Sequence, residues 1–352
     1  MAITLCGQSA FSYYRTPPQL LTFYPALPEI PSNPNHGNLA KAAVVTDLIG
    51  TPLHRIVDKT GNVRCSKLYR SHFIQNELPP GALRETEHGF QVTSPAMTLL
   101  TMAGSISRTH LLMAAYELCG TFAVFNPCKR SEYLLQQAIQ QRFIHPSDGW
   151  QRVVNVDGYG TNLWKRPPIL TSGELKRFCT HAHGFHGIKK LEWAANHMTG
   201  ETASPFEVET SLLLSLPRSA GGEGLTIRNN HRIQLSPAAR SIYRRTSCYA
   251  DILIEGKGDN AGMIIECQGR SVHASEAAGI SDSNRTTALS SMGYEVILLT
   301  RDQITSKQAF ETVLEIIARK TGIKRRSKTP RQQAAENALR HELFIDWSTL
   351  GS

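Results

Sequence analysis

The feature that most constrains the fold of this chain is a pair of short apolar segments, 250–255 and 263–267, each of which contains an acidic residue. The segment between them, 256–260, is rich in glycine, asparagine and aspartate, so the pair predicts two β-strands joined as a hairpin. Unpaired charge is costly inside a buried strand, which makes Asp251 and Glu266 informative departures from the apolar pattern. Two carboxylates on neighbouring strands are typical ligands of a hard divalent cation.

The residues after this hairpin predict a helix and a third strand. One helix face is marked by four residues at three- and four-residue spacing, Asp282, Arg285, Leu289 and Met292. Gly293 is typical of the position that follows a helix C-terminus, and the apolar segment 295–300 predicts the next strand. Two strands, a helix and a strand in this order indicate an α/β domain.

A further helix is predicted upstream of the hairpin. Ser204 suits the N-cap, Pro205 the first helical position, and Glu207 stands three residues after the cap, as in a capping box. The capping box explains Glu207 as well as a functional role does. Pro217 marks the end of this helix.

Residues from about 204 to 317 resemble the PD-(D/E)XK nuclease superfamily, and within it the small endonuclease domains that are similar to very-short-patch-repair enzymes. The family pattern has a helix glutamate, a strand aspartate, an acidic-x-lysine strand end, a histidine, an Asp-x-x-Arg helix and a Gly-aromatic step. The matching positions here are Glu207, Asp251, the triplet Glu266, Cys267 and Gln268, then His273, the pair Asp282 and Arg285, and finally Gly293 and Tyr294.

The resemblance implies a metal-dependent DNA endonuclease with a restriction-endonuclease-like α/β fold, a mixed central sheet flanked by helices. It assigns catalytic positions to Glu207, Asp251, Glu266, Gln268 and His273. Asp251 and Glu266 would bind Mg2+ or Mn2+, and Arg285 would contact a phosphate. Gln268 stands where the family has lysine, and its neutral amide binds water without supplying charge. A second interpretation stays open: a catalytically decayed nuclease fold that acts as a nucleic-acid-binding regulator or antitoxin-like protein.

The charge of the chain favours an anionic partner, and the resemblance identifies that partner as DNA. The net charge is +9 and the isoelectric point is about 9.3. One basic cluster, 319–331, contains no acidic residue, and a second precedes Asp251. Candidate nucleic-acid-binding residues are Arg244, Arg245, Arg285, Lys324, Arg325 and Arg326. The first cluster predicts a mobile, phosphate-contacting tail, or alternatively a solvated linker.

The first half of the chain carries weaker signals. Strands are predicted at 43–49, 64–68 and 89–92, and helices at 10–15, 94–100, 109–118, 175–178 and 191–197. The order of these elements weakly resembles the antitoxin and transcriptional-regulator proteins of abortive-infection systems. We therefore expect an α+β accessory or recognition domain at 1–172, a helical linker at 173–203, the nuclease domain at 204–320, and a basic tail with a terminal helix at 321–352.

The cysteines and the hydropathy pattern bear on the cellular context. Seven cysteines, an odd number without Cys-x-x-Cys spacing, indicate reduced thiols rather than a disulfide framework. Reduced thiols predict a cytoplasmic protein. We expect neither a secretory signal nor a membrane-spanning segment, because no apolar run is long enough. The sequence leaves open a homodimer and a protein partner of the N-terminal domain.

Overall fold

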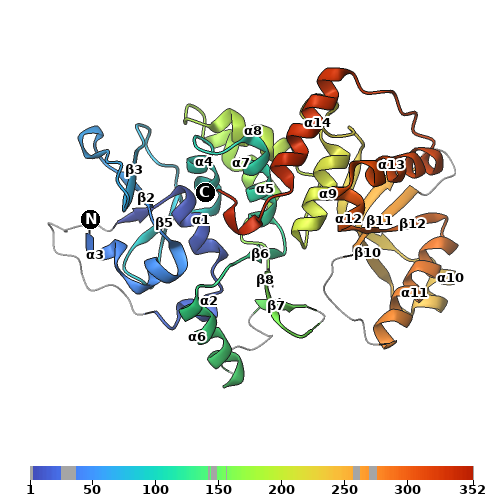
Figure 1. The fold of residues 1–352 in the computed structure, drawn as a ribbon, viewed down its shortest axis with the longest axis horizontal. Helices are drawn as coiled ribbons and strands as arrows, with labels where there is room; N and C mark the ends of the chain where they lie inside the picture. Colours follow the sequence, from blue (N-terminus) through green and yellow to red (C-terminus); the bar gives the residue numbers. More distant parts are fainter. Residues whose placement is uncertain are drawn as a thin grey trace. The chain divides into compact units, whose positions relative to one another are not determined.

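A computed structural model describes residues 3–24, 37–141, 143, 149–155, 157–256, 262–268 and 276–351. The chain divides into two compact units (Figure 1). Unit 1 contains residues 1–152, 162–198 and 346–352, and unit 2 contains residues 153–161 and 199–345. This division differs from the expected bounds: residues 173–198 belong to unit 1 rather than to a linker, and residues 321–345 belong to unit 2 rather than to a separate tail.

Unit 1 is built on a mixed five-stranded sheet with helices. The strands are β1 (Thr4–Leu5), β2 (Leu53–Val57), β3 (Tyr69–Phe73), β4 (Leu83–Glu85) and β5 (Gln91–Thr93), in the order β3-β2-β1-β5-β4. Strand β1 pairs antiparallel with β2 and parallel with β5. Three further short strands are β6 (Phe122–Val124), β7 (Gln151–Val154) and β8 (Gly160–Lys165), of which β6 and β8 pair antiparallel. Residues 153–154 of β7 and 160–161 of β8 are grouped with unit 2.

The helices of unit 1 are α1 (Gly7–Arg15), α2 (Pro18–Leu21), α3 (Gly37–Ala40), α4 (Pro95–Met102), α5 (Arg108–Cys119), α6 (Lys129–Gln140), α7 (Ser172–His181) and α8 (Ile188–His197). Ser94 caps α4 through a hydrogen bond from the amide of Met97, which confirms that predicted helix start. Helices α7 and α8 pack on α4 and α5, which explains why the expected linker belongs to this unit.

Two predicted strands of unit 1 are wrong. Residues Val45–Ile49 form a π-helical turn, which buries Val45, Leu48 and Ile49 on one side. An apolar run of this length fits a buried strand and a buried helical turn equally well, so its pattern does not decide between them. Strand β3 begins at Tyr69, after the expected strand 64–68, whereas β5 overlaps the expected strand 89–92.

Unit 2 contains a mixed four-stranded sheet flanked by helices, as expected for its α/β class. The strands are β9 (Ile227–Gln234), β10 (Ser247–Glu255), β11 (Gly262–Gln268) and β12 (Tyr294–Thr300), in the order β12-β11-β10-β9. Strands β9, β10 and β11 pair antiparallel in succession, and β11 pairs parallel with β12. The predicted hairpin, helix and third strand are therefore confirmed.

The helices of unit 2 are α9 (Pro205–Ser215), α10 (Pro237–Tyr243), α11 (Glu276–Ser291), α12 (Arg301–Thr305), α13 (Lys307–Thr321) and α14 (Pro330–Leu343), with a 3-10 turn at Arg218–Ala220. Helices α10 and α11 pack together against β9, β10 and β11, where they share a core that includes Ala239, Ala250, Ile264 and Leu289. Helix α9 contacts β9 and β10, and α13 contacts β11. Among the described residues, no helix has the length and apolar character needed to cross a membrane.

Candidate functional site

The acidic residues of the predicted hairpin meet where its two strands separate. The main-chain ladder joins Ile252–Glu255 of β10 to Gly262–Ile265 of β11. Two residues beyond this ladder on β11, the amide of Cys267 donates a hydrogen bond of 2.8 Å to the Oδ2 atom of Asp251, which stands one residue beyond the ladder on β10. A carboxylate therefore takes the place of a backbone acceptor at this point. Asp251 and Glu266 both stand at this fork between the strands.

Strand β9 is distorted opposite Asp251. The register joins Ala250 to His231 and Ile252 to Asn229, and it passes over Asp251 and Asn230. Asn230 has a φ of 46°, in the left-handed region that asparagine tolerates better than most residues. Local distortions of this kind re-aim side chains at sheet edges and functional sites. The sheet is therefore irregular on both sides of Asp251.

Glu266 is held by an arginine from the predicted helix. The two terminal nitrogens of Arg285 lie 2.6 and 3.0 Å from the two carboxylate oxygens of Glu266. Arg285 also donates to the carbonyl oxygen of Tyr249 on β10. The guanidinium group therefore bridges β10 and β11 across the fork.

Glu207 combines a capping role with a place in the acidic cluster. Its backbone amide donates to Ser204 Oγ at 3.2 Å, while its carboxylate accepts from the amide of Ala203 and the hydroxyl of Ser204 at 2.7 and 2.8 Å. In a capping box the glutamate accepts from the amide of the N-cap residue, whereas here Glu207 accepts from the amide of Ala203, the residue before the N-cap. Glu207 is only 8% exposed, and the charge of Asp251 acts on it. The capping interpretation of Glu207 is confirmed, and its functional role stays a prediction.

The three carboxyl groups resist ionisation in this setting. Burial raises the pKa of Glu207 and of Glu266 to about 7, and the charge of Asp251 adds to both shifts. Burial also raises the pKa of Asp251, against the effects of the Cys267 amide and of Arg285. Such clusters hold protons jointly, and a nearby cation favours their charged forms.

A surface cavity of about 680 Å³ opens beside Asp251 and Arg285. Its lining includes Tyr243 of α10, Tyr249 of β10 and Asp282 of α11, together with Arg245, which follows α10. Tyr249 is 52% exposed although it lies within a strand, and the Arg245 guanidinium lies over the ring of Tyr243, 5.6 Å from its centroid. Exposed aromatic rings beside cations are typical of surfaces that bind single-stranded nucleic acid.

The remaining predicted site residues lie around this cluster or outside the described part of the chain. Gln268 is exposed at the end of β11, and strand alternation places it on the same face as Glu266. Arg244 is exposed at the left-handed C-cap of α10, next to Arg245. His273 lies outside the described residues. Tyr249 is the residue that sequence reasoning missed, although an aromatic side chain two positions before Asp251 was a usable signal.

The donor chemistry of this site fits a hard divalent cation, but its present arrangement does not. Carboxylate oxygens are the ligands that Mg2+ and Mn2+ prefer. Both oxygens of Glu266 are already bound by Arg285. Within the described parts of the chain, no group of three or more histidine, cysteine, aspartate or glutamate residues is placed to hold a metal ion. The guanidinium charge disfavours a cation at Glu266, so metal binding there is favoured when Arg285 moves away.

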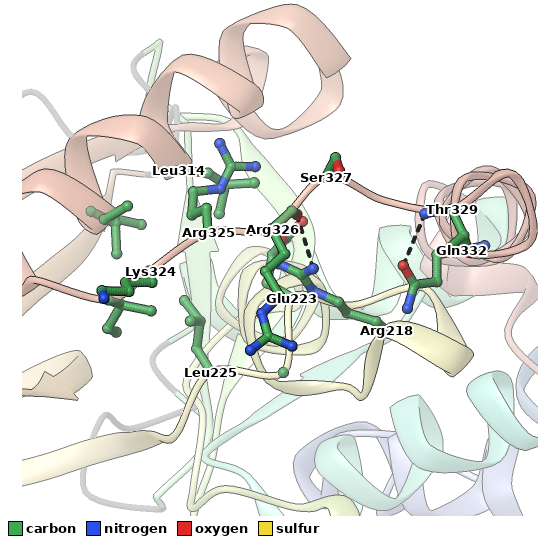
Figure 2. A pocket seen from close by; sticks show the side chains of 14 residues that line it. Arg218, Glu223, Leu225, Leu314, Lys324, Arg325, Arg326, Ser327, Thr329 and Gln332 are labelled. Atoms are coloured by element: carbon green, nitrogen blue, oxygen red, sulfur yellow. Dashed lines mark hydrogen bonds and ion pairs between the residues drawn. The ribbon is translucent and has the colours of Figure 1, made fainter.

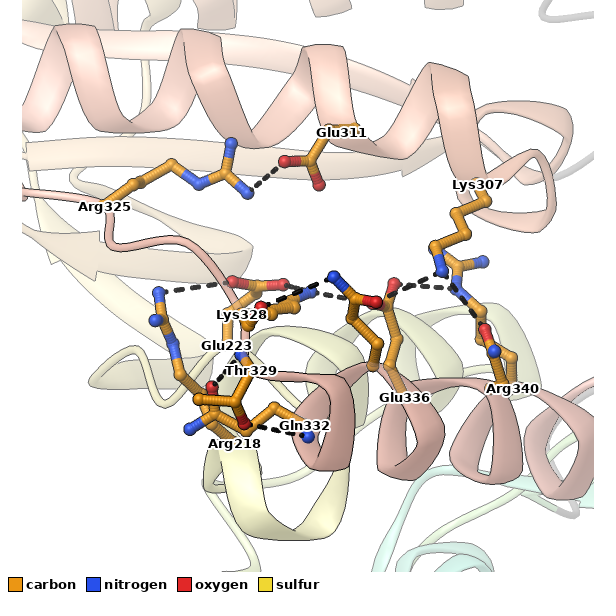
Figure 3. Close-up of polar contacts among 12 residues, drawn as sticks. Arg218, Glu223, Lys307, Glu311, Arg325, Lys328, Thr329, Gln332, Glu336 and Arg340 are labelled. Carbon is orange, nitrogen blue, oxygen red and sulfur yellow. Dashed lines mark hydrogen bonds and ion pairs between the residues drawn. The ribbon is translucent and has the colours of Figure 1, made fainter.

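The basic segment at 324–328 is anchored rather than loose (Figure 3). Lys328 binds Glu223 and lies 3.0 Å from a carboxylate oxygen of Glu336. Arg325 lies 2.6 Å from Glu311, and Arg218 donates to the carbonyl oxygen of Arg326 at 3.0 Å. These contacts do not match the expected mobile tail, because acidic residues distant in the sequence hold the segment. Lys324 and Arg326 remain exposed.

No protein-family model, curated protein or solved structure matches this chain.

Proposed function

We propose that unit 2 is a restriction-endonuclease-like domain of the PD-(D/E)XK superfamily that hydrolyses DNA with a divalent cation. One observation carries the proposal: Asp251 and Glu266 meet at the fork between β10 and β11 with Glu207 close enough to interact electrostatically. Burying three acidic groups together is unfavourable unless a cation or a proton compensates them. The adjacent cavity, with Arg245 and Tyr249, suits a nucleic-acid strand.

In this proposal Asp251 and Glu266 would hold Mg2+ or Mn2+ once Arg285 has moved aside, and the ion would supply an activated water and a positive charge beside the scissile phosphate. Gln268 positions water through its amide, since it has no charge to contribute. Glu207 keeps the N-terminus of α9 fixed beside Asp251. Arg245 contacts the phosphate backbone and Tyr249 offers a ring on which a base stacks.

A second function has its own supporting observation. Arg285 occupies both oxygens of Glu266, and Gln268 replaces the family lysine, so a cation of the protein itself substitutes for the metal. In that case unit 2 binds nucleic acid without cutting it and acts as a regulator. The cavity and the exposed basic residues serve this function equally well.

Cleavage assays separate the two functions. Supercoiled plasmid and single-stranded DNA are incubated with Mg2+ or Mn2+ and the wild type, Asp251→Ala or Glu266→Ala, with EDTA as a control. Cleavage by the wild type that both substitutions and EDTA abolish supports the nuclease. If the folded wild type binds DNA but leaves it intact under every condition, the result favours the regulator over the nuclease. Unchanged cleavage by either variant would disprove the site.

A further inference from the structure

A second cavity of unit 2, of about 530 Å³, lies between the end of α13, the residues after α9 and the segment that leads to α14. Figure 2 shows its lining, with Lys324, Arg325 and Arg326 following one another along that segment. The volume falls within the usual range for small-molecule sites, roughly 300–1,000 Å³. None of the proposed nuclease carboxylates lines it.

The cavity has an excess of positive charge. Four cationic residues and one carboxylate, Glu223, line it. Glu223 is already bound by Lys328, with Arg218 at 3.9 Å, and Arg325 pairs with Glu311. Among the described residues, Lys324 and Arg326 have no carboxylate partner, whereas their neighbours do. Two uncompensated cations at one cavity favour an anionic ligand.

Much of the rest of the lining is apolar. Leu314 and Ile317 of α13 are almost fully buried, whereas Leu225 and Ile323 are partly exposed and line the same cavity. The Gln332 Oε1 atom accepts a hydrogen bond from the amide of Thr329, so the side-chain nitrogen of Gln332 can donate to a ligand. An inorganic anion would contact only the cations of this cavity. A ligand that also has a flat, largely apolar group with a hydrogen-bond acceptor at its edge would contact the cations, the apolar side chains and Gln332.

We propose that this cavity binds a nucleoside phosphate. Its phosphate lies on Lys324 and Arg326, its base packs on Leu225 and Ile323, and the Gln332 amide nitrogen reaches the edge of the base. The ligand is either a free nucleotide or the terminal nucleotide of a DNA strand, since the two share this chemistry. The proposal does not depend on the nuclease activity, because none of the three carboxylates of that site lines this cavity.

The segment that carries the two cations is suited to such a role because it is fixed. Lys328 and the backbone of Arg326 are held by Glu223, Glu336 and Arg218. A site whose backbone is already ordered loses less conformational entropy on binding. The anchoring also separates the basic residues into two kinds. Arg325 and Lys328 pair with carboxylates of the protein, whereas Lys324 and Arg326 can bind a ligand.

The test is calorimetric titration of the full-length protein with AMP, dAMP, inorganic phosphate and a short 5′-phosphorylated oligonucleotide. The Lys324→Ala/Arg326→Ala variant is compared with Arg319→Ala/Arg331→Ala, which removes the same charge from exposed positions outside the cavity. We expect the first variant to weaken mononucleotide binding by about tenfold or more, equivalent to ~1.4 kcal/mol. We expect the control to change it by less than about twofold.

Three results would overturn the proposal: no saturable mononucleotide binding by the folded wild type, equal losses in both variants, or inorganic phosphate binding as tightly as AMP. A third variant, Ala318→Phe, fills the cavity without altering charge, and it should also abolish binding while the melting temperature stays close to that of the wild type. If the oligonucleotide displaces AMP at lower concentration, the ligand is a strand end; if it fails to displace AMP, the ligand is a free nucleotide.

Discussion

Arg285 binds Glu266 through two guanidinium nitrogens, at 2.6 and 3.0 Å from the two carboxylate oxygens. The guanidinium group of Arg285 thereby occupies the carboxylate that the proposed metal site requires as a ligand. We expect a divalent ion and Arg285 to compete for Glu266, because the guanidinium already binds both carboxylate oxygens and its positive charge repels a second cation. This competition makes the metal site testable through stability as well as through catalysis.

We predict that Arg285→Ala lowers the free energy of unfolding in metal-free buffer and that Mn2+ recovers much of the loss. The Glu266 side chain is 13% exposed, and leaving a buried charge unpaired costs about 3–5 kcal/mol. Denaturant unfolding with and without millimolar Mn2+ measures both effects. Arg301→Ala is the matched control, because it removes the partner of another buried glutamate, Glu209, at 2.8 Å. Equal recovery of both variants by Mn2+ would contradict competition at Glu266.

The pH dependence has a defined sign. Because folding raises the pKa of Glu207 and Glu266 from 4.5 to about 7, their protonated forms stabilise the native state. This contribution is complete below about pH 4.5 and is lost as the pH rises to about 7. Mn2+ binding has the opposite trend, because its ligands must lose protons. Thermal melts should show a larger Mn2+ shift at pH 8 than at pH 5.5, and no such difference in a Glu207→Gln/Glu266→Gln variant.

Given nuclease activity, Gln268→Lys should raise the cleavage rate. A lysine at the end of β11 adds positive charge near the developing negative charge of the phosphate, and a single electrostatic stabiliser is worth about 10²–10³ in rate. We expect an increase of at least about tenfold in single-turnover rate. Gln308→Lys makes the same chemical change at an exposed position of α13 and should leave the rate unaltered. A slower Gln268→Lys enzyme would mean that the amide itself is required.

Lys328 should be a stabilising residue rather than a DNA contact. Its ammonium group serves Glu223 and Glu336, whose side chains are 5% and 4% exposed. Lys328→Met leaves both carboxylates without this cation, so we expect a loss of about 3–5 kcal/mol in unfolding free energy. Arg331→Met, at an exposed position three residues later, should change it by no more than about 0.5 kcal/mol. Equal stability of the two variants would restore the mobile-tail interpretation.

Local sequence signals predicted much of unit 2. Ser204 and Pro205 marked the start of α9, and the segments around Asp251 and Glu266 defined the hairpin. Strand β9 escaped prediction because polar residues interrupt it; Asn229 is buried there and accepts a hydrogen bond from Ser211 at 3.0 Å. A buried polar residue paired by a distant hydroxyl cannot be distinguished from a surface residue in the sequence.

In the candidate site too, local contacts were predicted from the sequence and contacts between distant residues were not. The sequence indicated that Asp251 and Glu266 stand on adjacent strands, because hairpin pairing is local. It did not indicate that Arg285 reaches Glu266, because that contact depends on how α11 rotates against the sheet. The bounds of the two units were not predicted either, because α14 belongs to unit 2 through contacts with α9 and with the 3-10 turn Arg218–Ala220, which are far away in the sequence.

The most direct test of the central claim is a Mn2+ titration at pH 7.5, read by electron paramagnetic resonance of the free ion. The wild type is compared with Asp251→Asn/Glu266→Gln and with Glu311→Gln/Glu315→Gln, which neutralises two exposed carboxylates of α13. We predict saturable binding by the wild type and the control, and its loss in the Asp251→Asn/Glu266→Gln variant. If that variant binds Mn2+ as the wild type does, or if the folded wild type binds none, Asp251 and Glu266 are not a metal site.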